Sequence, residues 1–366
     1  MRMAFSFRLA LVSSAIVIVA WSTYAAPVTP VVPRIAPQNR PAAYDAAAEN
    51  QRCEACHTEI AAEWRASLHH QSWNDPVFLK AYAIEPQAFC RACHVPEADP
   101  TTTPVESARR LGVGCVTCHA PAGEIVSTNG HVADASRHAT RADTQFRTAA
   151  VCNGCHQFDF PEPQKAPMQG TRDEHRTSRF ASSSCQTCHM PLSVSADGSK
   201  HHKHDFRVLG NAAMLQSALS VDAYRGTNES LHVVLSAANV GHAVPTGDMF
   251  RRLEVRAHVL NEELAARPVV LARRFAMIPQ GNGLSGARRI QVGDDRVPSN
   301  GDAREVDLVF PESIRGKDIA WEVAYQRMPA AMAAVWGVDA KADEIIVARG
   351  ILPAQKENPE KESMKP

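Results

Sequence analysis

The chain has 366 residues, and its 39 basic and 39 acidic side chains give a formal net charge of zero. Hydrophobic residues make up 45% of it and aromatic residues only 6%. An ordinary apolar fraction with balanced charge excludes a disordered or collagen-like chain. The neutral balance gives no electrostatic basis for binding nucleic acid. The length allows two or three domains.

The first 25 residues have the pattern of a secretory signal. An apolar run over residues 9–21 follows the basic residues Arg2 and Arg8, and small residues lead to Ala25. An uncleaved membrane anchor is the alternative, but the run is short for a span of about 20 residues. We therefore predict Sec-type export with cleavage after Ala25, to the periplasm or the cell surface. Contact with a membrane is then expected only through partners or an uncleaved signal.

Two further segments have linker-like or tail-like composition. Residues 26–51 contain five prolines within fifteen positions, which predicts an extended, solvated linker. Residues 353–366 are rich in charge and are predicted to form a disordered tail.

All ten cysteines lie in five copies of the pattern C-x-x-C-H. The cysteine pairs are Cys53 and Cys56, Cys90 and Cys93, Cys115 and Cys118, Cys152 and Cys155, and Cys185 and Cys188. The histidines that follow them are His57, His94, His119, His156 and His189, and the copies are called the first to fifth motifs below. Two thiols at this spacing attach the two vinyl groups of one haem, and the next histidine is then held as an axial ligand of its iron. The motifs predict five covalently bound haem c groups.

Other uses of cysteine fit this pattern poorly. Zinc sites built from C-x-x-C use two such segments for each zinc ion, and five segments cannot all be paired. Disulfides would suit an exported protein but do not explain a histidine after every pair.

The cysteine motifs and the strand pattern predict an α + β fold in two domains. Residues 52–206 supply about 31 residues for each haem, so packed porphyrins must replace an ordinary side-chain core in a mostly helical and loop domain. From 225 to 352 short runs alternate apolar and polar residues, as at Leu231–Ala238 and Ile319–Tyr325. These runs predict a domain resembling an antiparallel β-sandwich, interrupted by a helix or turn at Ala330–Trp336.

Eleven histidines remain as candidates for the second axial position. His69 lies twelve residues after His57 within a predicted helix, Glu59–Trp73, and twelve residues of helix span about 18 Å. The two axial ligands of one iron lie only about 4 Å apart, so His69 must serve another haem. After the third motif, His131 or His138 is a candidate, with His131 favoured.

Three more candidates lie further along the chain. His175 stands between the fourth and fifth motifs, and His204 follows a basic turn. His242 lies in a loop shaped by glycine and proline after a strand, so it is predicted to reach from the β domain to a haem of the first domain. Met190 directly follows the fifth motif and is too close to serve that same iron.

Several stretches resemble multihaem c-type cytochromes of the cytochrome c-554 and hydroxylamine oxidoreductase-like group. They are Cys53–His57 with Trp64-x-x-Ser67-x-His69, Gly112–His119, Ser184–Pro191 and Gly241-His242-x-x-Pro245-Thr-Gly247. The resemblance implies closely stacked haems with mostly two histidine ligands, and gives His69, His204 and His242 as distal ligands. The sequence departs from the group at Ala120-Pro-Ala and at Glu174-His175, and it has no C-x-x-C-K motif.

The predicted function is electron transfer between redox partners, either other cytochromes or a quinol-linked donor. The alternative is a multihaem oxidoreductase in which one five-coordinate haem acts on a small nitrogen or sulfur compound. The sequence leaves open whether the protein is an enzyme and favours an electron carrier.

Overall fold

A computed structural model describes residues 40–355, apart from 42, 100–101, 134–137, 161–165, 207–209, 228 and 280–287. The predicted signal peptide, residues 26–39 of the predicted linker, and the predicted tail from 356 onward lie outside these residues. Over the described ranges, no helix combines the length and the apolar character needed to cross a bilayer.

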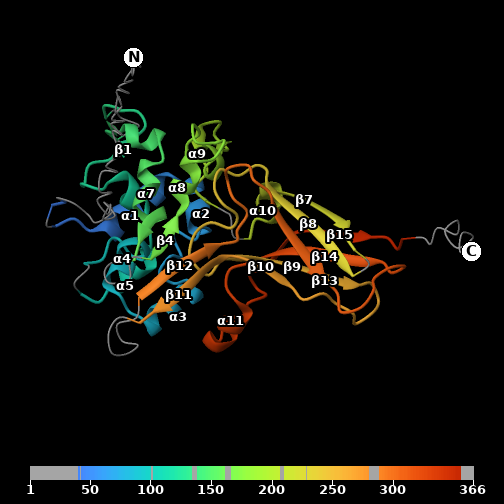
Figure 1. The fold of residues 1–366 in the computed structure, drawn as a ribbon. Helices are drawn as coiled ribbons and strands as arrows, with labels where there is room; N and C mark the ends of the chain where they lie inside the picture. The colour runs from blue at the N-terminus through green and yellow to red at the C-terminus, as the bar shows by residue number, and fades with distance from the viewer. Residues whose placement is uncertain are drawn as a thin grey trace, which may run out of the picture. The chain divides into compact units, whose positions relative to one another are not determined.

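Short helices alternate with turns in the first part of the chain, and strands dominate the second part (Figure 1). The helices are α1 (Ala46–Cys56), α2 (Thr58–Arg65), α3 (Pro76–Ile84), α4 (Ala88–His94), α5 (Glu106–Leu111), α6 (Cys115–His119), η1 (Thr144–Arg147), α7 (Ala150–His156), α8 (Thr171–Arg176), α9 (Cys185–His189), α10 (Ala212–Ala218) and α11 (Ala330–Trp336). The strands are β1 (Val126–Ser127), β2 (Arg141–Ala142), β3 (Gln157–Asp159), β4 (Pro167–Gly170), β5 (Leu192–Val194), β6 (Lys200–His202), β7 (Leu219–Arg225), β8 (Ser230–Ala237), β9 (Arg252–Val259), β10 (Val269–Leu271), β11 (Arg273–Ile278), β12 (Arg288–Asp294), β13 (Arg304–Val309), β14 (Ile319–Gln326) and β15 (Ile345–Leu352).

The predicted linker gives way to helix before residue 51. Asp45 is the N-cap of α1, and its carboxylate accepts hydrogen bonds from the backbone N–H groups of Ala47 and Ala48 at 3.0 and 3.1 Å. The helix therefore includes residues 46–51, which the proline-rich composition assigned to the linker.

The helix predicted over Glu59–Trp73 ends at Arg65 as α2. The hydroxyl of Ser67 donates to the carbonyl of Trp64 at 2.6 Å, which competes with the helical hydrogen bond, and the chain turns there. The carbonyl of His69 then accepts a hydrogen bond from the backbone N–H of Val113 at 2.9 Å. This contact fixes His69 beside the segment that leads into the third motif.

The second part of the chain contains two antiparallel sheets around one core. One sheet has the order β10-β9-β14-β15 and the other β13-β8-β7. Inward-facing residues of both sheets, such as Leu235, Leu253 and Val323, are fully buried in the same apolar cluster. This arrangement is consistent with the predicted α + β class. The sheets begin with β7 at Leu219, ahead of the predicted boundary at 225.

Residues 31–366 form one compact unit, so a division into a haem domain (52–206) and a β domain (225–352) stays a prediction. The two regions are called the haem half and the β half below. The hairpin β11–β12 of the β half reaches β4 of the haem half (Figure 1). The guanidinium of Arg273 donates to the carbonyls of Pro167 and Met168 at 3.0 and 2.7 Å.

Candidate haem site

Each C-x-x-C-H motif lies at the carboxyl end of a short helix. Helices α4, α6, α7 and α9 end at the motif histidine, and α1 ends one residue before it. A helix puts residues i and i+3 on one face, so both sulfurs of a motif point to the same side and the histidine follows one residue later. All ten cysteines are described, and none forms a disulfide.

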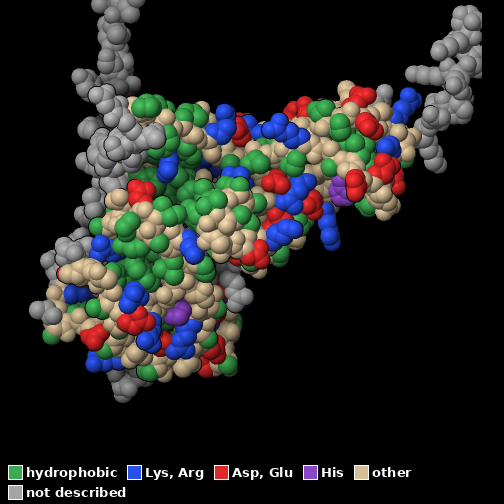
Figure 2. Space-filling view, turned by 90° about the horizontal axis from the view of Figure 1, so that it is seen from below, with side chains coloured by type: hydrophobic (Ala, Val, Ile, Leu, Met, Phe, Trp, Pro, Cys, Tyr) green, Lys and Arg blue, Asp and Glu red, His purple; other side chains and the backbone are tan. Residues whose placement is uncertain are grey.

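One large cavity joins the motifs. It is lined by all five motif histidines and by every motif cysteine except Cys56. Its volume of about 1430 Å³ exceeds the range of roughly 300–1,000 Å³ that is common for pockets binding one small molecule. In space-filling view, hydrophobic side chains gather around a hollow on the haem half, at the left, whereas charges of both signs mix over the β half (Figure 2). The residues present therefore fit several flat, mostly apolar groups.

Four of the five motif histidines face a second histidine across this cavity. The ring centroids are 6.2 Å apart for His57 and His138, 6.3 Å for His156 and His69, 6.2 Å for His119 and His204, and 6.2 Å for His189 and His242.

This separation is the one that an iron between two imidazoles requires. A ring nitrogen lies about 1.15 Å from the ring centroid, given bonds near 1.35 Å, and a metal–imidazole bond is about 2.0 Å. Two such halves sum to about 6.3 Å. Two rings stacked in direct contact lie closer together, as Phe78 and His94 do at 3.6 Å. The centroid spacing of each of the four pairs is compatible with one metal ion between the two rings.

Several of these histidines are oriented by a hydrogen bond at Nδ1. The acceptors are the carbonyls of Val126 for His119 at 3.0 Å and of His202 for His204 at 2.6 Å. A carbonyl oxygen only accepts, so Nδ1 carries the proton and Nε2 keeps its lone pair for a metal.

Burial favours the neutral form of three of the paired histidines, His69, His189 and His204. Desolvation lowers the pKa of His69 to about 3, and it lowers the pKa of His189 and of His204 to about 4. A neutral imidazole is the form that binds a metal. The electrostatics of the site thus favour ligation at ordinary pH.

The second motif differs from the other four. Nδ1 of His94 donates to the carbonyl of Ser72 at 2.7 Å, so this histidine is oriented like the others. All sixteen histidines lie in the described part of the chain, and among them none takes the facing position opposite His94. Its ring neighbour is Phe78, which stacks on it with an interplanar angle of 8°. The sequence did not predict that Phe78 lies at the site.

Two of the candidate ligands named from the sequence, His131 and His175, do not face a motif histidine, although His175 lines the cavity. The backbone of His131 pairs with that of Thr140, with hydrogen bonds of 2.8 and 2.9 Å, and the histidine facing His57 is His138. His175 lies against Gly241, where an added Cβ would stand 2.9 Å from Cδ2 of the His175 ring. The other three, His69, His204 and His242, each face a motif histidine.

Contacts between cysteines order the motifs in space. Side chains of Cys53 and Cys115 interact, which brings the first and third motifs together. Similar contacts join the second motif to the fourth (Cys93 with Cys155) and the fourth to the fifth (Cys152 with Cys185). Phe206 lies between His69 and His204, at 4.3 and 5.8 Å between centroids, and so bridges the fourth and third motifs.

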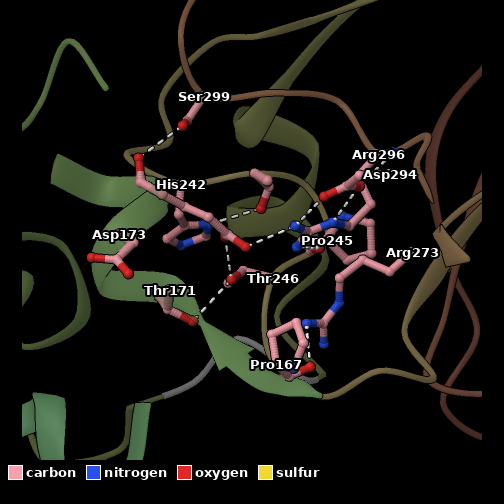
Figure 3. Close-up of polar contacts among 12 residues, drawn as sticks. Pro167, Thr171, Asp173, His242, Pro245, Thr246, Arg273, Asp294, Arg296 and Ser299 are labelled. Carbon is pink, nitrogen blue, oxygen red and sulfur yellow. Dashed lines mark hydrogen bonds and ion pairs between the residues drawn. The ribbon is translucent and has the colours of Figure 1, made fainter. Parts of the chain in front are cut away.

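The loop carrying His242 is anchored to both halves. The guanidinium of Arg296, which is 6% exposed, donates to the carbonyl of Pro245 at 2.9 Å and to the carboxylate of Glu174 at 2.8 Å (Figure 3). The hydroxyl of Thr246 donates to the other Glu174 oxygen at 2.6 Å. Sequence inspection gave no signal for this network, because Glu174 and Arg296 are 122 residues apart.

Comparisons with known proteins agree with this geometry. The family model for cytochrome c554 and c-prime matches residues 52–120. The fold is similar to the crystal structure of a penta-heme cytochrome c552 from Thermochromatium tepidum, with a TM-score of 0.66, 20% identity, and coverage of 83% of this chain and 98% of that chain. No curated protein is significantly similar in sequence.

The family match over residues 52–120 and the similar fold confirm the predicted resemblance, and they support a multihaem c-type cytochrome. Multihaem c-type cytochromes exchange electrons with redox partners through their haem groups.

Proposed function

We propose that this protein is a pentahaem c-type cytochrome that carries electrons between redox partners. The observation that carries the proposal is the set of four histidine pairs, each with ring centroids 6.2–6.3 Å apart and each containing one motif histidine. When bound, each haem supplies one-electron chemistry at its iron.

The proposed ligand pairs are His57 with His138, His119 with His204, His156 with His69, and His189 with His242. Three of the second ligands are those expected from the sequence, and His138 takes the place for which His131 was favoured. The chain holds these imidazoles in place by burying them and by hydrogen bonds at Nδ1. The ligands of each iron are thus in position before an electron is transferred. Two histidine ligands also favour a lower reduction potential than a histidine–methionine pair.

The cysteine contacts support a continuous path. The first, third and fourth motifs follow one another in space, and the second and fifth both adjoin the fourth. A connected series lets an electron enter near one motif and leave near another. The exposed cysteines Cys56 and Cys188 belong to the first and fifth motifs, which are therefore the proposed points of exchange with partners.

We further propose that the protein is exported to the periplasm or the cell surface after removal of residues 1–25. Covalent haem attachment through cysteine pairs suits an exported protein, and the amino-terminal pattern is that of a secretory signal. Other cytochromes or a quinol-linked donor are the proposed partners.

A second function is favoured by the surroundings of His94. Within the described residues no histidine faces it, so the haem of the second motif has no proposed sixth ligand from a histidine. An open position allows a small nitrogen or sulfur compound to bind, with electrons supplied from the neighbouring fourth motif.

The test is haem counting and ligand binding on the purified protein. Mass spectrometry together with pyridine haemochrome quantitation should give five thioether-bound haems for each chain. Addition of cyanide to the ferric protein should change the spectrum of one haem if the second function holds. A count below five would contradict the pentahaem proposal, and a spectrum unaffected by cyanide would contradict the second function alone.

A further inference from the structure

The conformation of the loop that carries His242 depends on contacts with other segments of the chain. Between β8 and β9 the chain forms turns and bends, with one isolated backbone pairing of Val244 with Val297 at 2.9 and 3.1 Å. A loop of this kind opens easily unless other hydrogen bonds hold it. The residue before Val297 is Arg296, so backbone and side-chain contacts reach the loop from the same point of the β half.

Arg296 joins three segments at once. Its guanidinium donates to Pro245 of the loop at 2.9 Å, to Glu174 of α8 at 2.8 Å, and to Asp294 at the end of β12 at 2.9 and 2.7 Å (Figure 3). The planar fork of arginine makes these directed contacts together, which the single ammonium group of lysine does not.

Glu174 completes the connection on the side of the haem half. One of its carboxylate oxygens accepts from Arg296, and the other accepts from the hydroxyl of Thr246 at 2.6 Å. Its backbone carbonyl accepts from Ser299 at 2.9 Å. The hydroxyls of Thr171 and Thr246 lie 2.9 Å apart and tie the start of α8 to the same loop (Figure 3).

These contacts act within four residues of His242. Pro245 and Thr246 follow it by three and four positions, and His175, next to Glu174, packs on Gly241 at the preceding position. Functional groups must be held to within about 0.5 Å by their supporting residues. The ring centroids of His242 and His189 lie 6.2 Å apart, which is close to the distance of about 6.3 Å that an iron between two imidazoles requires.

We propose that Arg296, acting with Glu174, is the positioning residue for His242, so that the β half controls the distal ligand of the fifth-motif haem. This rests on the proposed function, in which His189 and His242 bind one iron. The role is specific to one haem, because the other three pairs, His57 with His138, His156 with His69 and His119 with His204, lie entirely within the haem half.

The experiment uses the ferric holoprotein and electron paramagnetic resonance. The His189 and His242 rings are nearly parallel, at 11°, whereas the other pairs are inclined by 39°, 64° and 79°. Nearly parallel imidazoles give a rhombic low-spin signal that is distinct from the signals of strongly crossed rings. In Arg296→Gln this rhombic signal should be lost, and a high-spin signal equal to one haem should appear in addition to that of the second-motif haem. Added imidazole should restore the low-spin state of the fifth-motif haem.

Three further variants complete the experiment. Glu174→Gln keeps the size of the side chain but removes the ion pair with Arg296, and this variant should lose part of the rhombic signal. Arg296→Lys should retain only part of it. Arg274→Gln is the matched control, because Arg274 lies in the same hairpin with its side chain 61% exposed and should leave all signals unchanged.

Each outcome decides between the role of Arg296 and the proposed ligand pair. If Arg296→Gln and Glu174→Gln keep the rhombic signal while His242→Ala loses it, the positioning role is wrong and the ligand pair stands. If His242→Ala also keeps it, the ligand pair itself is wrong. If the Arg296 variant does not accumulate, Glu174→Gln decides by the same criterion. Loss of all low-spin signals together would overturn the specific role.

Discussion

The two halves of this protein are stabilised by different kinds of core. In the β half, 22 buried residues from both sheets, α10 and the connecting segments form one continuous apolar cluster. In the haem half the described residues supply two small clusters, of four residues around Trp64 and three around Trp73. The space between the motifs is a cavity, which five haems would fill. Among the described residues, only the β half therefore has a large apolar core made of side chains alone.

Withholding haem should have the largest effect. Expressed without the machinery for haem attachment, the chain should leave the haem half unfolded while the β half keeps its sheets, since the apolar area buried by Trp64, Trp73 and their neighbours is small. Limited proteolysis with mass spectrometry and far-ultraviolet circular dichroism would measure this. A protected fragment that includes residues 52–206 would contradict the difference between the halves.

The second largest effect is expected from shortening a core side chain, and it should differ between the two halves. Leu235→Ala removes a fully buried side chain from the sandwich and should lower the free energy of unfolding by about 2–5 kcal/mol without changing the visible spectrum. Trp64→Ala should cost about 3–5 kcal/mol and also disturb the spectrum. The reason is that Trp64 packs on Val116 of the third motif and donates to Val113 at 2.8 Å. Equal spectral changes in both variants would remove the distinction.

A smaller effect, confined to one haem, is expected at the first motif. His138→Ala should convert one haem to high spin, because His138 faces His57 across 6.2 Å. His131→Ala is the matched control from the same segment and should leave the spectrum unchanged. The reverse result would return the ligand role to His131.

Acid should produce the most gradual effect. Burial lowers the pKa of His69 to about 3, from an ordinary value of 6.5, so the unfolded chain binds a proton that the folded chain excludes. The free energy of unfolding should therefore fall as the pH drops from about 6.5 toward 3, by up to about 1.4 kcal/mol per pH unit for this group. Denaturant unfolding of the holoprotein at pH 7 and pH 5 would measure it. A stability that rises on acidification would contradict the burial of these histidines.

The β half was largely predictable from the sequence. Strand β8 alternates buried and half-buried residues, and the predicted runs Leu231–Ala238 and Ile319–Tyr325 match β8 and β14 to within about one residue. The short strands β10, β11 and β12 were not predicted. The alternation of β11 and β12 is weak, because this pair forms a separate hairpin and its burial pattern is irregular.

In the haem half the motifs were predictable and their surroundings were not. The cysteine spacing is local, so C-x-x-C-H predicts five attachment sites without any knowledge of the fold. The facing histidine is set by contacts between distant segments, as with His69, whose carbonyl binds Val113, 44 residues later. Local context favoured His131 over His138, and it gave no sign that the backbone of His131 pairs with that of Thr140.

The central claim is that four histidine pairs bind haem iron while His94 has no histidine opposite. Spin quantitation of the fully oxidised holoprotein by electron paramagnetic resonance tests it most directly. The account predicts four low-spin haems and one high-spin haem per chain. Five low-spin haems would contradict the difference at His94, and two or more high-spin haems would contradict the ligand pairs.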